Sequence, residues 1–313
     1  MNDQETIFLK DFEAFNRFFF RSCYFHQMLA CYKYFGVKPE YVIANYLNLY
    51  VRDKGSNELT TKEQQIFSQQ EFETYTGVRQ FKYVPKQNIC QELIKRLQIG
   101  SPSIIIIDYY YLPFRKELYK KVHIDHYISI CGVDFRRRQF QILELNADDD
   151  MRYGKHFISF EVLRIAFEKG LICMKTGRDP FVTFEKVSEI NFKNYIKDTQ
   201  KRYKRYKTQI KSSYRILAQY LSVLFRENLC CNPMRAKSLD DLRWQKIRQK
   251  YQMCFVYKDK KEKLGRAFRK IINGYAYLSA HFSDSPVLNQ GIALGRIISE
   301  IKHGEQYIKK VLL

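Results

Sequence analysis

The chain has 313 residues, of which 45% are hydrophobic and 16% aromatic, with 54 Lys and Arg against 33 Asp and Glu. This composition excludes a disordered chain and predicts one large or two modest domains with a buried core. The formal net charge of +21 predicts an acidic partner, which is a nucleic acid, an anionic membrane surface or an acidic protein.

No apolar run approaches the ~20 residues of a membrane-spanning helix, and residues 1–5 do not have the composition of a basic and apolar leader. We therefore expect a cytoplasmic protein with no transmembrane segment. In that compartment the eight cysteines are expected to be free thiols. Their spacing includes no paired Cys-x-x-Cys and no Cys/His set typical of zinc, so we expect no metal and no bound cofactor.

The pattern between Ser22 and Gly36 predicts a helix. Ser22 is a favourable N-cap, Gly36 is the usual left-handed stop, and apolar residues recur every three or four positions. Cys23 lies in the first turn, where free backbone N–H groups and the positive end of the helix dipole favour a thiolate. Cys23 is therefore a candidate nucleophile, and the alternative is a small buried core residue.

Further helices are expected in the N-terminal half. A turn at Pro39 precedes a predicted helix over residues 40–50, followed by a polar surface loop over residues 52–62. Residues 88–97 have an amphipathic pattern that also predicts a helix.

Three strands are predicted after these helices. Residues 103–108 form a β-branched apolar run that is typical of a central strand. Residues 126–134 and 139–146 are expected to pair as an antiparallel hairpin, and residues 159–170 form a helix after them. A layer of helices followed by a sheet indicates an α+β fold.

From about residue 191 the pattern is almost wholly helical and densely charged, which predicts four or five helices in a bundle. We expect an N-terminal catalytic domain over residues 1–188 and a basic, all-α domain over residues 189–313. A basic run near the start of the second domain is a candidate partner-binding surface, and the alternative is a solvated helix face. The run contains Lys201, Arg202, Lys204, Arg205 and Lys207.

A histidine and an asparagine lie at neighbouring ends of the predicted hairpin. His126 opens one strand and Asn146 closes the next, and antiparallel pairing brings such ends together. With Cys23 they follow the order of a papain-like triad, in which the histidine takes the thiol proton and the third residue orients the imidazole. Asp148 is the alternative third member. Each residue also has a plainer interpretation, as a surface histidine, a turn, a solvated acidic loop or a weak metal site.

Three segments, residues 23–36, 108–114 and 126–134, resemble the N-terminal domain family of butirosin biosynthesis protein H, which is related to bacteriocin-processing cysteine peptidases. The second segment reads Asp-x-x-x-Leu-Pro-Phe and the third reads His-Tyr-x-x-x-x-Gly-x-Asp. The resemblance covers about residues 10–170 and implies a papain-like domain that bears the cysteine on a helix packed on an antiparallel sheet. It also implies an acyltransferase of antibiotic or other secondary metabolism.

The resemblance implies roles for the candidate residues. Cys23 would accept an acyl chain as a thioester from the phosphopantetheine arm of an acyl carrier protein, and His126 would act as the base. The acceptor would be an amine of a small molecule. Asn146 would take the third position, where the family commonly has an acidic residue.

The chain departs from papain-like enzymes before the cysteine. Those enzymes place an oxyanion-stabilising glutamine six residues before the nucleophile, and here Arg17 stands at that position, with Asn16 next to it. These two residues, together with Asp108 at a strand end, are candidates for oxyanion or positioning roles. The backbone N–H of Cys23 is one expected oxyanion donor, and the second is not identified.

Carrier proteins are acidic, so a basic surface would steer one to the site and raise the encounter rate. A cysteine peptidase or amidase of the same fold is the closest alternative, and a catalytically inactive binding protein is another. Nucleic-acid binding is favoured less. Tyr203 and Tyr206 alternate with basic residues, as in stacking surfaces, but no nucleic-acid-binding motif accompanies them. Association of the basic helices with a membrane surface is favoured least.

Overall fold

The computed structural model describes residues 6–17, 22–55, 58–86, 88–146, 152–174, 177–226, 233–283 and 291–313. The chain divides into two compact units. Unit 1 consists of Met1–Pro39 and Gln69–Asn191, and unit 2 consists of Glu40–Ser68 and Phe192–Leu313.

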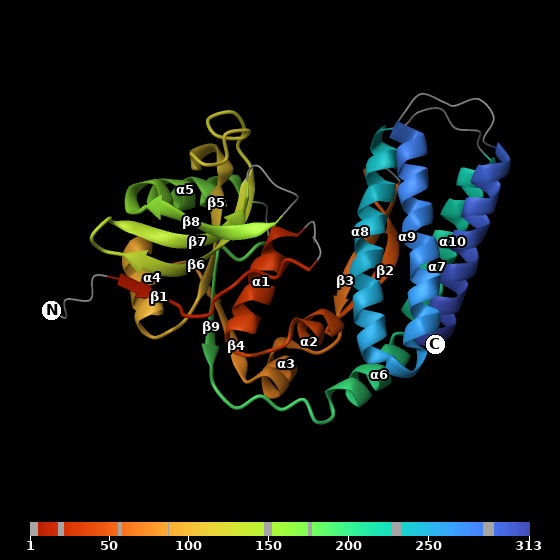
Figure 1. Ribbon diagram of the computed structural model, residues 1–313, viewed down its shortest axis with the longest axis horizontal. Helices are drawn as coiled ribbons and strands as arrows, with labels where there is room; N and C mark the ends of the chain where they lie inside the picture. The colour runs from red at the N-terminus through yellow and green to blue at the C-terminus, as the bar shows by residue number, and fades with distance from the viewer. Residues whose placement is uncertain are drawn as a thin grey trace. The chain divides into compact units, whose positions relative to one another are not determined.

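Unit 1 contains helices and a large sheet (Figure 1). Its helices are α1 (Cys23–Tyr34), α3 (Gln69–Thr76), α4 (Ile89–Gln98), the 3₁₀ turn η1 (Tyr109–Tyr111) and α5 (Phe160–Cys173). Its strands are β1 (Thr6–Phe8), β4 (Val78–Tyr83), β5 (Ser103–Asp108), β6 (Asp125–Asp134), β7 (Gln139–Leu145), β8 (Tyr153–Ser159) and β9 (Phe181–Lys186). The strands pair in the order β4-β9-β5-β6-β7-β8, with β1 also paired to β6, and every pairing is antiparallel. The expected α+β class is therefore confirmed.

Helix α1 begins and ends where its sequence predicts. The Ser22 hydroxyl accepts a hydrogen bond from the Phe25 N–H at 3.3 Å, and Gly36 has a φ of 83°, a left-handed conformation that glycine adopts without strain. From Phe25 to Tyr32 every residue of the helix is buried. The helix packs against β5 and β6, so its first turn is held beside the central strands of the sheet.

A β-bulge interrupts the pairing of β6 with β7. Ile130 lies opposite Ile142, but Gly132 lies opposite Gln141, so Cys131 is an extra residue on β6. The bulge therefore shifts the register by one residue in the half of the hairpin that is farther from the turn, where β6 begins and β7 ends.

The register shift decides which side chains share a face of the sheet. A regular hairpin continued from its turn would place Glu144 opposite Ser129, on the face that His126 does not share. With the bulge, Ser129 pairs with Leu143, so the next residue, Glu144, falls at the level of Ile128 and on the same face as His126. The bulge therefore brings a carboxylate and an imidazole of neighbouring strands together.

Unit 2 is a helical bundle with a two-stranded sheet. Its elements are α2 (Pro39–Ala44, whose first residue belongs to unit 1), β2 (Tyr46–Arg52), β3 (Leu59–Gln65), α6 (Tyr195–Arg205), α7 (Lys207–Arg226), α8 (Pro233–Val256), the 3₁₀ turn η2 (Lys258–Lys260), α9 (Lys261–Ser283) and α10 (Gly291–Leu312). The expected helical character of the chain after residue 191 agrees with these bounds.

The predictions for residues 40–62 were wrong in part. The expected helix over residues 40–50 ends at Ala44, and β2 follows it directly and pairs with β3. Part of the expected loop over residues 52–62 is therefore strand. β2 carries the buried residues Leu47 and Tyr50 and packs against α7, and β3 packs against α8. Tertiary packing outweighs local helix preference here.

The two units also divide the chain differently from the two predicted domains. One crossing, at residues 191 and 192, lies close to the expected boundary at 188. The segment Glu40–Ser68, which we expected in the N-terminal domain, packs with the helical unit instead. Among the helices that the structure describes, none is both long and apolar enough to cross a bilayer.

Candidate active site

The thiol of Cys23 interacts with the imidazole of His126, which is carried by β6. Burial alone would raise the pKa of Cys23, but the charge of His126 and a hydrogen bond with it lower that pKa below its usual value. The position of Cys23 as the first residue of α1 acts in the same direction, because the helix dipole favours an anion there. The site therefore favours a thiolate.

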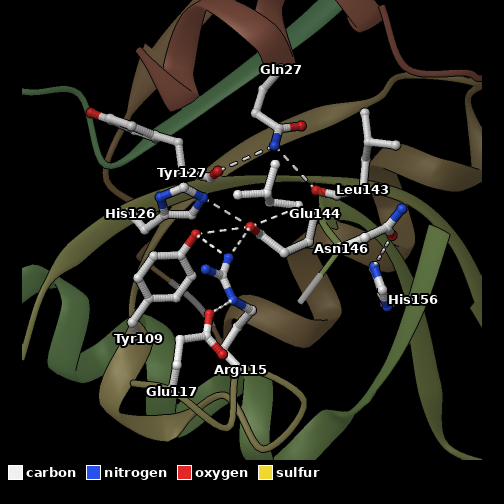
Figure 2. Close-up of polar contacts among 11 residues, drawn as sticks. Gln27, Tyr109, Arg115, Glu117, His126, Tyr127, Leu143, Glu144, Asn146 and His156 are labelled. Atoms are coloured by element: carbon white, nitrogen blue, oxygen red, sulfur yellow. Dashed lines mark hydrogen bonds and ion pairs between the residues drawn. The ribbon is translucent and has the colours of Figure 1, made fainter. Parts of the chain in front are cut away.

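His126 forms an ion pair with Glu144 of β7, with 2.9 Å between His126 Nε2 and Glu144 Oε2 (Figure 2). Burial lowers the pKa of His126, but the negative charges of Glu144 and Cys23 outweigh it and raise the pKa to about 10. Since Nε2 faces Glu144, Nδ1 is the nitrogen left for Cys23. The three residues form a cysteine–histidine–glutamate arrangement in which the imidazole is protonated and oriented.

The second oxygen of Glu144 is held by three donors. Glu144 Oε1 accepts from the Tyr109 hydroxyl at 2.8 Å, from Arg115 Nη1 at 3.1 Å and from the Leu145 N–H at 2.7 Å (Figure 2). The side chain of Glu144 is fully buried, and burial alone would raise its pKa, but His126, the Leu145 N–H and the Tyr109 hydroxyl keep the pKa below its usual value. Glu144 is therefore a permanent buried anion beside His126.

The sheet opens where these residues meet. In a continued register Leu145 would lie opposite Tyr127, but the Leu145 N–H is taken by Glu144. The amide of Gln27 on α1 donates to the carbonyl of Tyr127 at 3.3 Å and to that of Leu143 at 3.1 Å (Figure 2). Side chains thus replace the missing ladder bonds, and α1 is fastened to both strands where they separate.

Asn146, the predicted third member, does not contact His126. Its Oδ1 lies 3.1 Å from His156 Nε2, and its side chain lies over Gly154, where a Cβ would be 2.4 Å from the same oxygen (Figure 2). The prediction of Asn146 is therefore corrected to Glu144, two residues earlier on the same face. Asp148, the alternative, lies outside the described residues.

Glu144 lies inside a strand and not at its end, so the pattern of strand ends in the sequence did not point to it. One signal was available, since an acidic residue between Leu143 and Leu145 in a buried strand needs a specific partner. The partner could not be identified without the register.

The predicted positioning residues lie elsewhere. The side-chain amide of Asn16 donates to the carbonyl of Tyr153 and accepts from its N–H, both at 2.9 Å. Arg17 is exposed. Asp108 caps η1 through the Tyr110 N–H at 3.0 Å and pairs with His123 Nδ1 at 2.6 Å. Asn16 and Asp108 are thus engaged in structural contacts.

The basic run lies on α6 and at the start of α7, in unit 2. Four of its members (Lys201, Lys204, Arg205 and Lys207) are exposed. Arg202 is half-buried, stacks over Phe67 and donates to the Ile66 carbonyl. Tyr203 is fully buried, with its hydroxyl bonded to the Ala44 carbonyl, so it cannot stack on a base. This burial removes one of the two aromatic residues behind the nucleic-acid alternative.

A hollow of about 450 Å³ opens beside the thiol and is lined by Cys23, Tyr24, Tyr127, Arg178 and their neighbours. The rings of Tyr24 and Tyr127 meet edge to face, with centroids 5.1 Å apart. The wall of the hollow therefore combines the Cys23 side chain with aromatic and cationic groups.

Within the described residues, no group of three or more His, Cys, Asp or Glu side chains could hold a metal ion. A scan against models of known protein families finds no match, and a search of curated proteins finds none either.

The lowered pKa of Cys23 predicts unusual alkylation behaviour. We expect the rate at which Cys23 reacts with iodoacetamide to rise with pH. The midpoint of this rise should lie below about 8.5, the pKa of a free thiol. Replacing His126 by alanine should move the midpoint above that value, because burial then acts alone. Peptide mapping across a pH series measures this, with Cys90 as an internal control because burial raises its pKa to about 11. A Cys23 midpoint equal to that of Cys90 would contradict the expectation.

Proposed function

We propose that the protein is a cysteine-dependent acyltransferase that moves an acyl group from a carrier-protein thioester to an amine through an acyl-Cys23 intermediate. The observation that carries the proposal is the arrangement of Cys23, His126 and Glu144, in which the thiol interacts with an imidazole, the imidazole pairs with a buried carboxylate, and Cys23 lines an open hollow. A thiolate paired with a protonated imidazole is the form in which a cysteine attacks a carbonyl carbon.

In the first step the Cys23 thiolate attacks the carbonyl carbon of the donor thioester. The bond from that carbon to the donor sulfur breaks, and the leaving phosphopantetheine thiolate takes the proton of His126. The acyl group is then held on Cys23 as a new thioester. The neutral imidazole remains oriented by the buried carboxylate of Glu144.

In the second step an acceptor amine attacks acyl-Cys23. His126 accepts the proton of the amine, the carbon–sulfur bond breaks, and an amide is released. The thiolate–imidazolium pair is thereby restored. The N–H of Cys23, at the start of α1, is available to stabilise the oxyanion in both steps, because the first N–H groups of a helix have no partner within it.

The fold supports the proposal in outline. A papain-like arrangement has a cysteine at the start of a helix packed on an antiparallel sheet, with the histidine and its orienting residue on neighbouring strands. α1, β6 and β7 are consistent with that description. We propose an acidic carrier protein as donor because the chain carries a net charge of +21, and a small-molecule amine of a biosynthetic pathway as acceptor.

The test is to incubate the protein with an acyl-loaded carrier protein and to measure its intact mass. We expect one acyl adduct in the native protein and none in Cys23→Ala. Cys31→Ala is the matched control, because Cys31 is on the same helix but is buried and its pKa is raised. An adduct that persists in Cys23→Ala overturns the proposal. Cleavage of peptides without transfer from a carrier would assign the same site to a peptidase or amidase.

A further inference from the structure

Arg178 lines the hollow beside Cys23. It follows Gly177, whose φ of 84° turns the chain, and its side chain is 35% exposed. Its guanidinium lies over the ring of Tyr127, 6.0 Å from the centroid, and Tyr127 is the residue after His126 on β6. A cation is therefore anchored at the wall of the hollow that holds the reactive thiol.

The contact between Arg178 and Asp125 uses only part of the hydrogen-bonding capacity of the guanidinium. Its Nη1 donates to Asp125 Oδ2 at 2.6 Å, while a guanidinium carries five N–H donors in a planar fork. The Asp125 side chain is only 8% exposed, so it holds the guanidinium from the protein side. The neighbouring acidic residue, Asp179, is paired with Lys82 at 2.7 Å.

We propose that Arg178 binds a carboxylate on the acyl chain of the substrate, so that the enzyme prefers acyl groups that carry a negative charge near their thioester. This inference rests on the proposed acyl transfer and names its substrate class. A planar fork matches a carboxylate through two parallel hydrogen bonds. The aromatic rings of Tyr24 and Tyr127 would contact the carbon chain between the carboxylate and the thioester.

The phosphate of a phosphopantetheine arm is a poorer match for Arg178. Two amide-linked segments separate that phosphate from its thiol, and Arg178 lines the same hollow as the Cys23 thiol. The acyl chain begins at the reacting sulfur and so enters the hollow that Arg178 lines, whereas that phosphate is remote from the sulfur.

The test uses two methanethiosulfonate reagents that differ in charge, one with a sulfonatoethyl and one with a trimethylammonioethyl group. In each reaction the Cys23 thiolate attacks the reagent sulfur, a disulfide forms and methanesulfinate leaves. Both reagents place their charge a few bonds from the new sulfur bond. The measurement is the ratio of the two rates at Cys23, followed by peptide mapping of the full-length protein.

The deciding variant is Arg178→Gln combined with Asp125→Asn, because it removes both charges and leaves no unpaired carboxylate. In this double variant we expect the ratio of the anionic to the cationic rate to fall about tenfold from its native value. Arg178→Lys should keep most of the preference, since it retains the charge. Arg164→Gln is the matched control, because Arg164 forms an exposed ion pair with Glu168 on α5, and its ratio should equal the native one.

The outcomes separate the two proposals. A native ratio in the double variant means that Arg178 only balances Asp125, and this overturns the anion site. Slow reaction of Cys23 with both reagents counts against the nucleophile and hence against the proposed function. Even when both reactions are slow, the ratio of the two rates still tests the role of Arg178, because the ratio does not depend on the absolute rate.

Discussion

Replacing Glu144 by glutamine is expected to slow the alkylation of Cys23 at neutral pH by about 100-fold, the range in which a positioned acid–base group contributes. The pKa of His126 is about 10 because the charges of Glu144 and Cys23 outweigh the effect of burial. A neutral amide removes the larger of the two effects that raise the pKa of His126, so the imidazolium loses stability and the thiolate loses its counter-ion. The reaction should recover only at higher pH, where the thiol ionises without help.

The control for this prediction is Asn146→Ala. Asn146 contacts His156 and not His126, so its removal should change the alkylation rate by no more than about twofold, as for a site without a shared partner. The pH series described for the native protein serves both variants. Equal losses in the two variants, or a larger loss in Asn146→Ala, would restore Asn146 as the orienting residue.

Local signals in the sequence were sufficient for the first two members of the site. Ser22 and Gly36 bound helix α1, and a cysteine in the first turn of such a helix is distinctive. His126 lies on the predicted strand, one residue after the point where β6 begins. Helix caps and strand boundaries depend on residues nearby in the chain, so they can be predicted from the sequence.

The third member depends on pairing between strands, which is not local. A hairpin without a bulge places Glu144 on the face that His126 does not share, and the extra residue Cys131 reverses this. Gly132, directly after Cys131, is the only local signal of a bulge, and a glycine inside a strand can equally mark a close backbone approach. The prediction of Asn146 followed from the strand ends, and the register places it on the correct face but two residues too far.

The segment at residues 46–65 shows a different limit. β2 and β3 carry buried side chains because helices α7 and α8, more than 100 residues later in the chain, pack against them. The alternation of apolar residues in β2 is short enough to fit either a strand or one face of a helix. Long-range packing therefore decided an element that the local pattern left open.

The opened ladder between β6 and β7 connects the fold to the chemistry. Glu144 accepts from the N–H of Leu145 with one oxygen and pairs with His126 through the other. Gln27 closes the other side of the opening, and it lies one helical turn after Cys23. The same contacts that hold the strands apart therefore fix Cys23, the imidazole of His126 and the carboxylate of Glu144 relative to one another.

Replacing Arg115 by methionine is expected to destabilise unit 1 by about 3 kcal/mol, the cost of leaving a buried charge without one of its partners. Arg115 is 9% exposed and donates to both Glu144 and Tyr109. Because the pKa of Glu144 is lowered in the folded protein, its contribution to stability is present above the pKa of the unfolded state and is lost as the pH falls. Without Arg115 that pKa should rise, so the variant should lose stability at a higher pH than the native protein.

Hydrogen exchange of the β6 and β7 amides measures this loss within unit 1. The fluorescence of the single tryptophan, Trp244, reports on α8 in unit 2 and serves as an internal reference. Glu117→Gln is the matched control, because Glu117 is the exposed partner of Arg115, and its change should stay within about 0.5 kcal/mol.

A double variant, Arg115→Met with Glu144→Gln, separates charge compensation from packing. If Arg115 acts by compensating the charge of Glu144, neutralising the carboxylate should return about half or more of the lost stability. The effects of substituting two contacting residues on the free energy of unfolding are not additive. Full loss in the double variant would mean that Arg115 contributes through its packing over Tyr109, at 4.8 Å from the ring centroid, and not through its charge. In that case the negative charge of Glu144 would be stabilised by His126 together with the Tyr109 hydroxyl and the Leu145 N–H, and the pKa of Cys23 would not depend on the charge of Arg115.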